Sequence, residues 1–413
     1  MRQRRLYLYS FFRYLWTYKL TPVGRVLVLA IMVTALGSVT SQLPIYQLFC
    51  GLLALLAVAE VVGLIFKPRL RVDGEVPTRM VAGEPVSASI LVSNQSTWRP
   101  ALDVMLGLFG LPEGLRHADA DLFVPVIQPG ASVPMPLTIV AGRRGIYPLP
   151  GISVVSTFPF NLIRFGGART SPSRVVVLPA YHALDELAVP VSQRYQPGGV
   201  MLAQGVGHSP EYIGNREYVP GEAARRIDSR AWARTGKPVV REYHEEYASR
   251  VALVLDTFLP ASRFRRSVHE QRLEAAVSLM AAIATGLNIH EHVIDLFAAG
   301  PEMYVFKGLG ATPHTDSVLE ILAGIGACRH NPFDDITPLV TEQLATISTM
   351  ICVFIDWDTV RARFLEQVLE AGCRVKGVLV VSTAGGESAS IPSADELVIV
   401  QAEDVLSGAV RDL

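Results

Sequence analysis

The chain has few cysteines, and their spacing argues against a disulfide framework or a zinc site. Of 413 residues only four are cysteines, and they stand singly at Cys50, Cys328, Cys352 and Cys373. A structural zinc site needs thiols or imidazoles at short intervals such as CxxC. We therefore expect the soluble part of the protein to lie in a reducing compartment.

The chain also lacks an excess of charge of either sign. Lysine and arginine total 37, aspartate and glutamate total 38, and the formal net charge is −1. This balance argues against a nucleic-acid partner. Gly205-Val206-Gly207 lacks the Lys-Ser/Thr of a phosphate loop and the third glycine of a dinucleotide fingerprint, so we interpret it as linker and expect no cofactor.

Two long hydrophobic runs lie near the N-terminus. Val26–Leu43 is uncharged, and Ile45–Phe66 is interrupted only by Glu60. Each run is long enough to cross a bilayer as a helix, and the break at Pro44 leaves only a tight connection between them. A cleaved signal peptide is the alternative for the first run, but a second run follows it. The pattern predicts a transmembrane hairpin that contacts membrane lipid through residues 23–66.

The flanks of the two runs predict their orientation. Residues 1–22 are basic and aromatic, which favours a segment at the membrane surface over an unstructured tail. Lys67 and Arg69 follow the second run, whereas the connection carries no charge. The positive-inside rule then places both ends and the soluble domains in the cytoplasm. We expect Glu60, about two helical turns from Lys67, to snorkel toward the membrane interface rather than to act as a functional carboxylate.

Residues 67–180 have the pattern of a small all-β domain. Short β-prone runs alternate with turn sequences such as Gln128-Pro129-Gly130, at a spacing typical of an immunoglobulin-like β-sandwich. The expected strands are Val86–Val92, Leu102–Leu108, Pro136–Val140 and Gly151–Val155. No convergent catalytic set occurs here, so we interpret this domain as a spacer or binding module.

The most charged stretch of the chain is Glu211–Glu246, inside a connector that we assign to residues 181–249. Pro220-Gly221 indicates a turn, after which we expect a short helix from Glu222. That helix would align Arg226, Arg230 and Arg234 in a basic stripe at i, i+4, i+8. After Gly236-Lys237-Pro238 the alternation predicts a strand over Val239–Tyr247. The nearby acids lead us to expect Arg225, Arg234 and Glu242 in internal ion pairs, with a partner-facing role for the stripe as the alternative.

This stretch resembles the signature of the bacterial "domain of unknown function 58" family. One departure is Ser229 in place of an aromatic residue, with Trp232 nearby as a substitute. The signature residues are Tyr218, Pro220, Gly221, Glu222, Arg225, Arg226, Asp228, Arg234, Arg241, Glu242, Glu245 and Glu246. The resemblance implies a von Willebrand factor A-like domain after the signature and a location at the bacterial inner membrane. It also implies protein partners, namely a MoxR-type AAA+ ATPase and other von Willebrand A-type proteins.

From residue 250 to 413 strand and helix patterns alternate, which predicts a doubly wound α/β domain. The expected strands are Val251–Leu255, His292–Phe297, Met350–Ile355, Val375–Val381 and Glu396–Val400, and the expected helices are Glu270–Leu287, Asp316–Cys328 and Thr359–Ala371. Ligands of such sheets bind beyond the carboxyl ends of the strands. This places Asp256 and Asp356 at the expected edge.

The resembled fold usually holds a divalent cation at this edge through an Asp-x-Ser-x-Ser motif, a loop threonine and a further aspartate. Here the motif reads Asp256-Thr257-Phe258-Leu259-Pro260, so both serine hydroxyls are missing. A hard cation needs clustered oxygen ligands. We therefore expect a degenerate, metal-free site at Asp256, Thr257 and Asp356.

The residues offer little support for catalysis. Cys328 beside His330, or His244 beside Glu245 and Glu246, supplies reactive groups without a catalytic motif. We expect no enzyme activity and predict a membrane-tethered adaptor or scaffold that docks an AAA+ ATPase or its client on the cytoplasmic face. A cell-envelope biogenesis scaffold that acts without an ATPase is the first alternative. A cation-dependent protein-binding module is the second.

Overall fold

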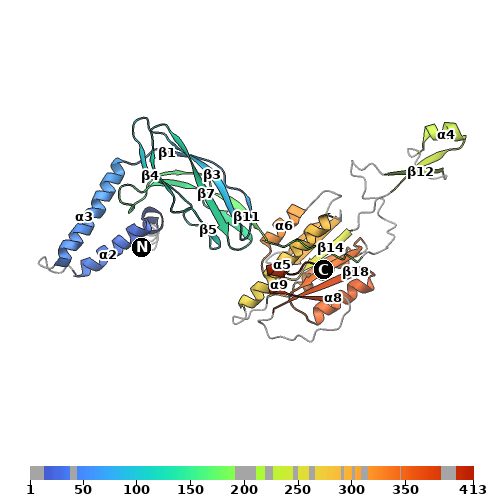
Figure 1. Ribbon diagram of the computed structural model, residues 1–413. Helices are drawn as coiled ribbons and strands as arrows, with labels where there is room; N and C mark the ends of the chain where they lie inside the picture. Colours follow the sequence, from blue (N-terminus) through green and yellow to red (C-terminus); the bar gives the residue numbers. More distant parts are fainter. Residues whose placement is uncertain are drawn as a thin grey trace, which may run out of the picture. The chain divides into compact units, whose positions relative to one another are not determined.

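A computed structural model describes residues 14–37, 44–190, 211–218, 227–244, 250–259, 266–289, 293–299, 303–307, 315–344, 346–382 and 397–413. The chain divides into two compact units, Met1–Ala180 and Tyr181–Leu413 (Figure 1). Each unit has a hydrophobic core of its own.

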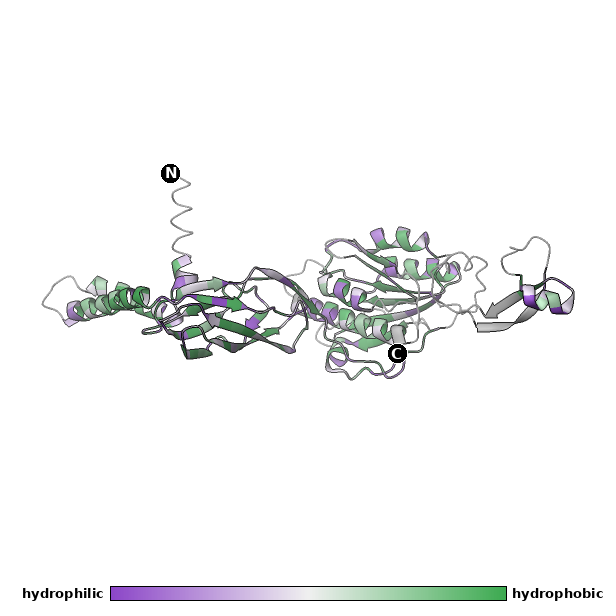
Figure 2. Cartoon of the chain, turned by 90° about the horizontal axis from the view of Figure 1, so that it is seen from above, coloured by the Kyte–Doolittle hydropathy of each residue, from purple (hydrophilic) through white to green (hydrophobic). Residues whose placement is uncertain are grey.

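The first unit begins with a short π-helix and two apolar α-helices, η1 (Leu15–Lys19), α2 (Pro22–Gly37) and α3 (Pro44–Ile65). Each α-helix starts at a proline, whose fixed φ and missing N–H suit the first helical position. The two helices pack together. Figure 2 shows them at the left of the picture, hydrophobic along most of their length. Among the described helices, α3 alone is long and apolar enough to cross a membrane, whereas α2 has 16 residues. The expected first run continues into residues 38–43, outside the described residues.

Eleven described strands follow and form the β-domain. They are β1 (Leu70–Asp73), β2 (Arg79–Val81), β3 (Pro85–Asn94), β4 (Ala101–Gly107), β5 (Leu115–His117), β6 (Phe123–Ile127), β7 (Ser132–Ala141), β8 (Gly145–Leu149), β9 (Ser153–Ser156), β10 (Phe165–Arg169) and β11 (Ser173–Leu178). The sheet orders are β1-β3-β7-β5, β10-β9-β4-β6 and β2-β11-β8. Ile90 of β3, Val104 of β4 and Leu137 of β7 lie in one shared core, because alternate side chains of each strand point to the same face.

The β9–β10 loop (residues 157–164) attaches the β-domain to the two helices. The N–H of Thr21, just before α2, donates to the carbonyl oxygen of Leu162 at 3.1 Å. Arg164 Nη1 donates to the carbonyl oxygens of Tyr18 and Leu20 at 3.1 and 2.8 Å, so it caps the C-terminal end of η1. Burial lowers the pKa of Arg164 to about 10, and the nearby charge of Arg25 adds to this effect.

Close approach at this junction requires glycine at two helix positions. A Cβ on Gly24 would collide with the carbonyl group of Leu162, and a Cβ on Gly63 would collide with the ring of Phe165. Glu60 of α3 lies near a basic residue of η1. Its Oε1 lies 3.9 Å from Nζ of Lys19, because the junction holds η1 beside α3.

The second unit contains a six-stranded sheet in the order β16-β15-β14-β17-β18-β19. The strands are β14 (Arg250–Leu255), β15 (Val293–Ala299), β16 (Met303–Lys307), β17 (Thr349–Phe354), β18 (Arg374–Val381) and β19 (Leu397–Gln401). The β15–β16 pair is antiparallel and the other neighbours are parallel. Numbered along the chain within this sheet, the order is 3-2-1-4-5-6, so the topological switch point lies between β14 and β17. The sheet is therefore mixed, with an antiparallel edge strand that the sequence pattern did not predict.

The helices of this domain are α5 (Arg266–Ile289), α6 (Thr315–Gly324), α7 (Phe333–Thr341), α8 (Thr359–Glu370) and α9 (Ala402–Ser407). Phe333 of α7 and Phe364 of α8 share one core cluster with Ala252 and Val254 of β14. The helix α5 packs against α6, α9 and the sheet. The expected helix Asp316–Cys328 is too long, because Cys328 leaves it to form a β-bridge with Phe258.

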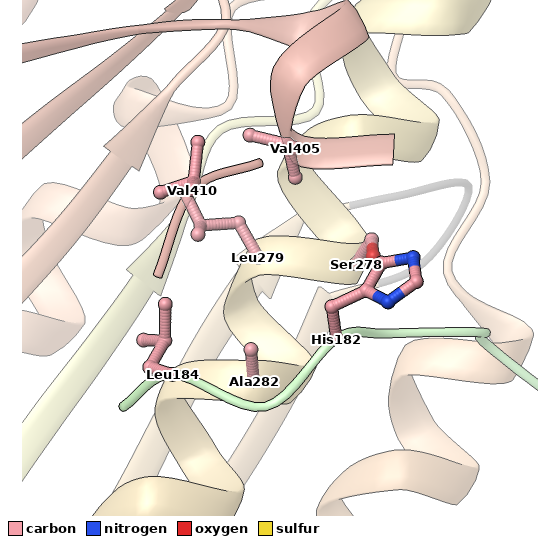
Figure 3. A pocket seen from close by; sticks show the side chains of 7 residues that line it. All are labelled: His182, Leu184, Ser278, Leu279, Ala282, Val405 and Val410. Carbon is pink, nitrogen blue, oxygen red and sulfur yellow. The ribbon is translucent and has the colours of Figure 1, made fainter. Parts of the chain in front are cut away.

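The connector after the β-domain is joined to the C-terminal end of the chain. The N–H of Asp185 donates to the carbonyl oxygen of Arg411 at 2.7 Å, and that of Leu413 donates to the carbonyl oxygen of Glu186 at 3.0 Å. Figure 3 shows His182 of this connector in a small pocket beside Ser278 of α5. The lining is otherwise aliphatic, so this pocket is packing space between the connector, α5 and α9 rather than a polar binding site.

Candidate functional site

The family-like signature forms a hairpin that carries a short helix. The strands β12 (Glu211–Glu217) and β13 (Val239–His244) pair in antiparallel register, and α4 (Ser229–Thr235) lies between them in the chain. The carboxylate of Asp228 accepts hydrogen bonds from the N–H groups of Arg230 and Ala231 at 3.0 and 3.1 Å. Gly236 ends the helix in the left-handed conformation. Both ends of α4 are therefore capped.

This cap changes the expected helix. We expected a helix from Glu222, but Ile227 forms a β-bridge with Val240 and α4 begins at Ser229. Asp228 is the N-cap residue, so α4 contains Arg230 and Arg234 of the expected stripe. The third residue of the stripe, Arg226, lies outside the described residues. Arg234 is exposed, and its expected internal ion pair stays a prediction, because the side chains of Glu222, Glu242, Glu245 and Glu246 are not described.

The other signature residues are described only in part. The N–H of Tyr218 donates to the carbonyl oxygen of Pro238 at 2.9 Å. Arg241 and Glu242 lie on β13, where only their backbone is described. Pro220, Gly221, Glu222, Arg225, Arg226, Glu245 and Glu246 lie outside the described residues.

The carboxyl edge of the six-stranded sheet contains a buried ion pair. Asp256 follows β14, and its Oδ2 accepts from Nε of Arg361 in α8 at 2.8 Å. Both side chains are almost fully buried, with 0% and 1% exposed. The N–H groups of Phe258 and Ile355 also donate to this carboxylate, at 3.1 and 3.3 Å.

Arg361 connects Asp256 to the first turn of α8. Its Nη1 donates to Oδ2 of Asp358 at 2.8 Å, and Asp358 is also the N-cap of that helix. Aromatic rings of Phe258 and Phe333 lie 5.6 and 5.4 Å from the guanidinium carbon, within cation–π range. The guanidinium therefore lies among two carboxylates and two rings.

In this cluster the ion pairs and burial have opposite effects on the pKa values of Asp256 and Arg361. Burial is the largest influence on Asp256 and raises its pKa, while the charge and hydrogen bond of Arg361 oppose that rise. For Arg361 burial acts to lower the pKa, but the charges and hydrogen bonds of Asp256 and Asp358 together raise it. We take the guanidinium to be fully charged, because it faces two carboxylates that accept its hydrogen bonds.

These residues do not fit a divalent cation. Such an ion needs several unoccupied oxygen ligands, whereas Asp256 is already neutralised by Arg361. Thr257 is fully buried. Asp356 accepts from the N–H of Trp357 at 2.9 Å. Arg361 is the central residue of the site, and sequence reasoning missed it; the only signal was its spacing of three residues after Asp358 on an expected helix.

A second group of reactive residues lies near this edge. Sγ of Cys328 is 3.4 Å from Nδ1 of His330, whose Nε2 is 3.1 Å from Oδ2 of Asp335. The thiol is only 1% exposed, so a substrate cannot reach it as the chain is folded. His244 ends β13, where its side chain is not described.

Comparisons with solved structures give only distant similarities. Escherichia coli alpha-2-macroglobulin in its native conformation is 13% identical over 28% of this chain and 7% of its own length, with a TM-score of 0.22. The trypsin-activated form is 12% identical over 38% of this chain and 9% of its own, with a TM-score of 0.21. The SrpA adhesin of Streptococcus sanguinis is 12% identical over 32% of this chain and 70% of its own, with a TM-score of 0.18. This chain thus spans less than a tenth of the first two proteins, and these similarities carry no argument.

The comparison with family models is more informative. No curated protein matches the chain. Residues 214–403, which hold the signature and most of the α/β domain, match the model described as "Protein of unknown function DUF58". This match confirms the resemblance drawn from the signature, for residues 214–403 of the chain.

Proposed function

We propose that this chain is a membrane-anchored, non-enzymatic docking protein on the cytoplasmic face of a bacterial inner membrane. The length of α3, the apolar α2 packed beside it and the basic residues on both flanks support a two-span hairpin over residues 23–66. The proposed occupant of the docking surface is a MoxR-type AAA+ ATPase or its client.

The domain architecture fits this proposal. Two four-stranded sheets that share a core support an immunoglobulin-like β-sandwich over residues 67–180. A doubly wound sheet with one antiparallel edge strand supports a von Willebrand factor A-like fold over residues 250–413. Neither fold supplies a reaction by itself, since function depends on the sites that a fold carries.

The observation that carries the proposal is the exposed surface of α4. Trp232 is 44% exposed, and Arg230 and Arg234 are exposed on either side of it in the sequence. Tryptophan and arginine are the residues that most often dominate the free energy of binding at protein interfaces. The caps at Asp228 and Gly236 hold this helix in one conformation, which lowers the entropy cost of binding. The two arginines favour an acidic surface on the partner.

The carboxyl edge of the sheet argues against the cation-dependent alternative. A cation-dependent module bridges its partner through a metal ion with an open coordination position. Here Arg361 supplies the positive charge at Asp256, and both residues are buried. We therefore assign the proposed docking surface to α4 rather than to this edge.

Binding of the purified full-length protein to a MoxR-type ATPase from the same organism tests the proposal. Trp232→Ala should weaken binding about 30-fold, since a hot-spot residue contributes about 2 kcal/mol or more. Arg234→Glu should also weaken it. Lys237→Ala is the matched control, because Lys237 lies in the same hairpin and pairs with Glu217 at 3.0 Å. Equal binding by all variants would refute the docking surface, and a failure of the wild-type protein to bind would favour an envelope scaffold that acts without an ATPase.

A further inference from the structure

A loop of the β-domain lies at the end of α3. Nη1 of Arg99 donates to the carbonyl oxygen of Ile65, the last residue of that helix, at 2.6 Å. The neighbouring Trp98 is 69% exposed, although the Arg99 guanidinium lies 4.1 Å from its ring centroid. A large aromatic side chain is thus held at the helix end with most of its surface uncovered.

The β9–β10 loop places a second aromatic side chain near the same end of the helix pair as Trp98. Its residues Asn161 and Leu162 accept hydrogen bonds from the hydroxyl of Thr21, immediately before α2 begins. Phe160, next to them, is 48% exposed. The ring of Phe158 contacts Phe66, just after α3, with centroids 5.5 Å apart. The start of α2 and the end of α3 therefore mark one plane, and Trp98 and Phe160 lie close to it.

Exposed basic residues accompany these rings. Lys67 and Arg69 follow α3 directly, and all three of Lys67, Arg69 and Arg99 are exposed. Aromatic side chains favour the headgroup layer of a bilayer, where an apolar ring meets a polar surface. Basic side chains at that depth attract anionic lipids, at about 1 kcal/mol per residue.

We infer that Trp98 and Phe160 insert into the headgroup layer of an anionic membrane leaflet, so that the β-domain binds lipid directly. The inference rests on the membrane anchoring proposed above, and it adds a lipid-binding surface outside residues 23–66. It would fix the β-domain against the bilayer, whereas a flexible tether would leave Trp98 in water.

Tryptophan fluorescence of the full-length protein in lipid nanodiscs tests this inference. The discs contain phosphatidylcholine and phosphatidylglycerol, with or without phosphatidylcholine brominated on the upper acyl chain as a quencher. The chain has four tryptophans, so variants are compared. Trp98→Phe should lose part of the bromine-quenched emission, whereas the control Trp232→Phe should lose none of it. Adding Phe160→Trp to the Trp98→Phe variant should restore quenched emission.

Unchanged quenching in Trp98→Phe would overturn the inference, and it is also the result expected if another protein covers Trp98. Equal quenching of Trp98 in discs of phosphatidylcholine alone would overturn the preference for anionic lipid. Release of the full-length protein from membranes by alkaline carbonate would overturn the anchoring proposal and this inference together. A protein that stays in the membrane with Trp98 unquenched would remove only the inference.

Discussion

The replacement Arg361→Ala should strongly destabilise the α/β domain. It removes the 2.8 Å hydrogen bond to Asp256 and leaves that carboxylate buried without a charged partner. Breaking a buried pair in this way typically costs about 3–5 kcal/mol. The N–H groups of Phe258 and Ile355 still donate to Asp256, so we expect the lower half of that range.

Thermal unfolding of the full-length protein in detergent, followed by circular dichroism, measures the effect. For a domain of this size 1 kcal/mol shifts Tm by roughly 2–4 °C, so Arg361→Ala should lower it by roughly 6–16 °C. Arg363→Ala, an exposed neighbour on α8, is the matched control and should change Tm by little. The partial exposure of Asp358, at 42%, makes its lost ion pair with Arg361 a minor contribution.

A double replacement separates the ion pair from simple loss of packing. Asp256→Ala combined with Arg361→Ala removes both charges, so its cost should be smaller than the sum of the single costs. Additive costs would show that the two side chains do not depend on each other. An unchanged Tm in Arg361→Ala would refute the reasoning altogether.

Three further predictions concern topology, metal binding and the junction in the first unit. A reporter fused after Leu413 should be cytoplasmic, and cleavage of the soluble domains by protease outside intact cells would contradict this. Calorimetry should detect no millimolar or tighter Mg²⁺ binding, and a saturable isotherm abolished by Asp256→Ala would show the opposite. Gly63→Ala should lower the Tm of the first unit because its methyl group meets the ring of Phe165, at a cost of about 1–3 kcal/mol, while Gly51→Ala on the same helix has open space and should be neutral.

Much of the α/β domain could be predicted because its central strands are apolar on both faces. The run Val251–Leu255 is buried throughout and was recognised from hydrophobicity alone. The edge strand β16 was not predicted, because its apolar run Met303–Phe306 is only four residues long and a run that short does not by itself distinguish a strand. The helix α7 was missed because Pro338 lies inside it and proline usually ends a helix.

The candidate site was harder to predict, because its key contact joins distant parts of the chain. Asp256 and Arg361 are separated by 105 residues, and only the parallel pairing of β14 with β17 brings them together. Sequence reasoning placed Asp256 at the correct edge but described it only by the ligands that it lacked. The predicted start of α4 was wrong for a local reason. Asp228 was interpreted as a helical residue, although it is the N-cap.

Arg361 and Arg234, both in the second unit, differ in how much stability the protein would lose on their replacement. This difference separates a structural role from a docking role. Arg361 is buried, so the folded domain depends on it and it is not accessible to a partner. Arg234 is exposed, so its replacement should change stability by less than about 1 kcal/mol. A side chain that contributes little to folding stability is free to contact a partner, because the folded domain does not depend on it. On α4, Arg230, Trp232 and Arg234 are exposed and meet that condition. A loss of ATPase binding without a change in Tm is therefore the result that would distinguish docking from a structural role.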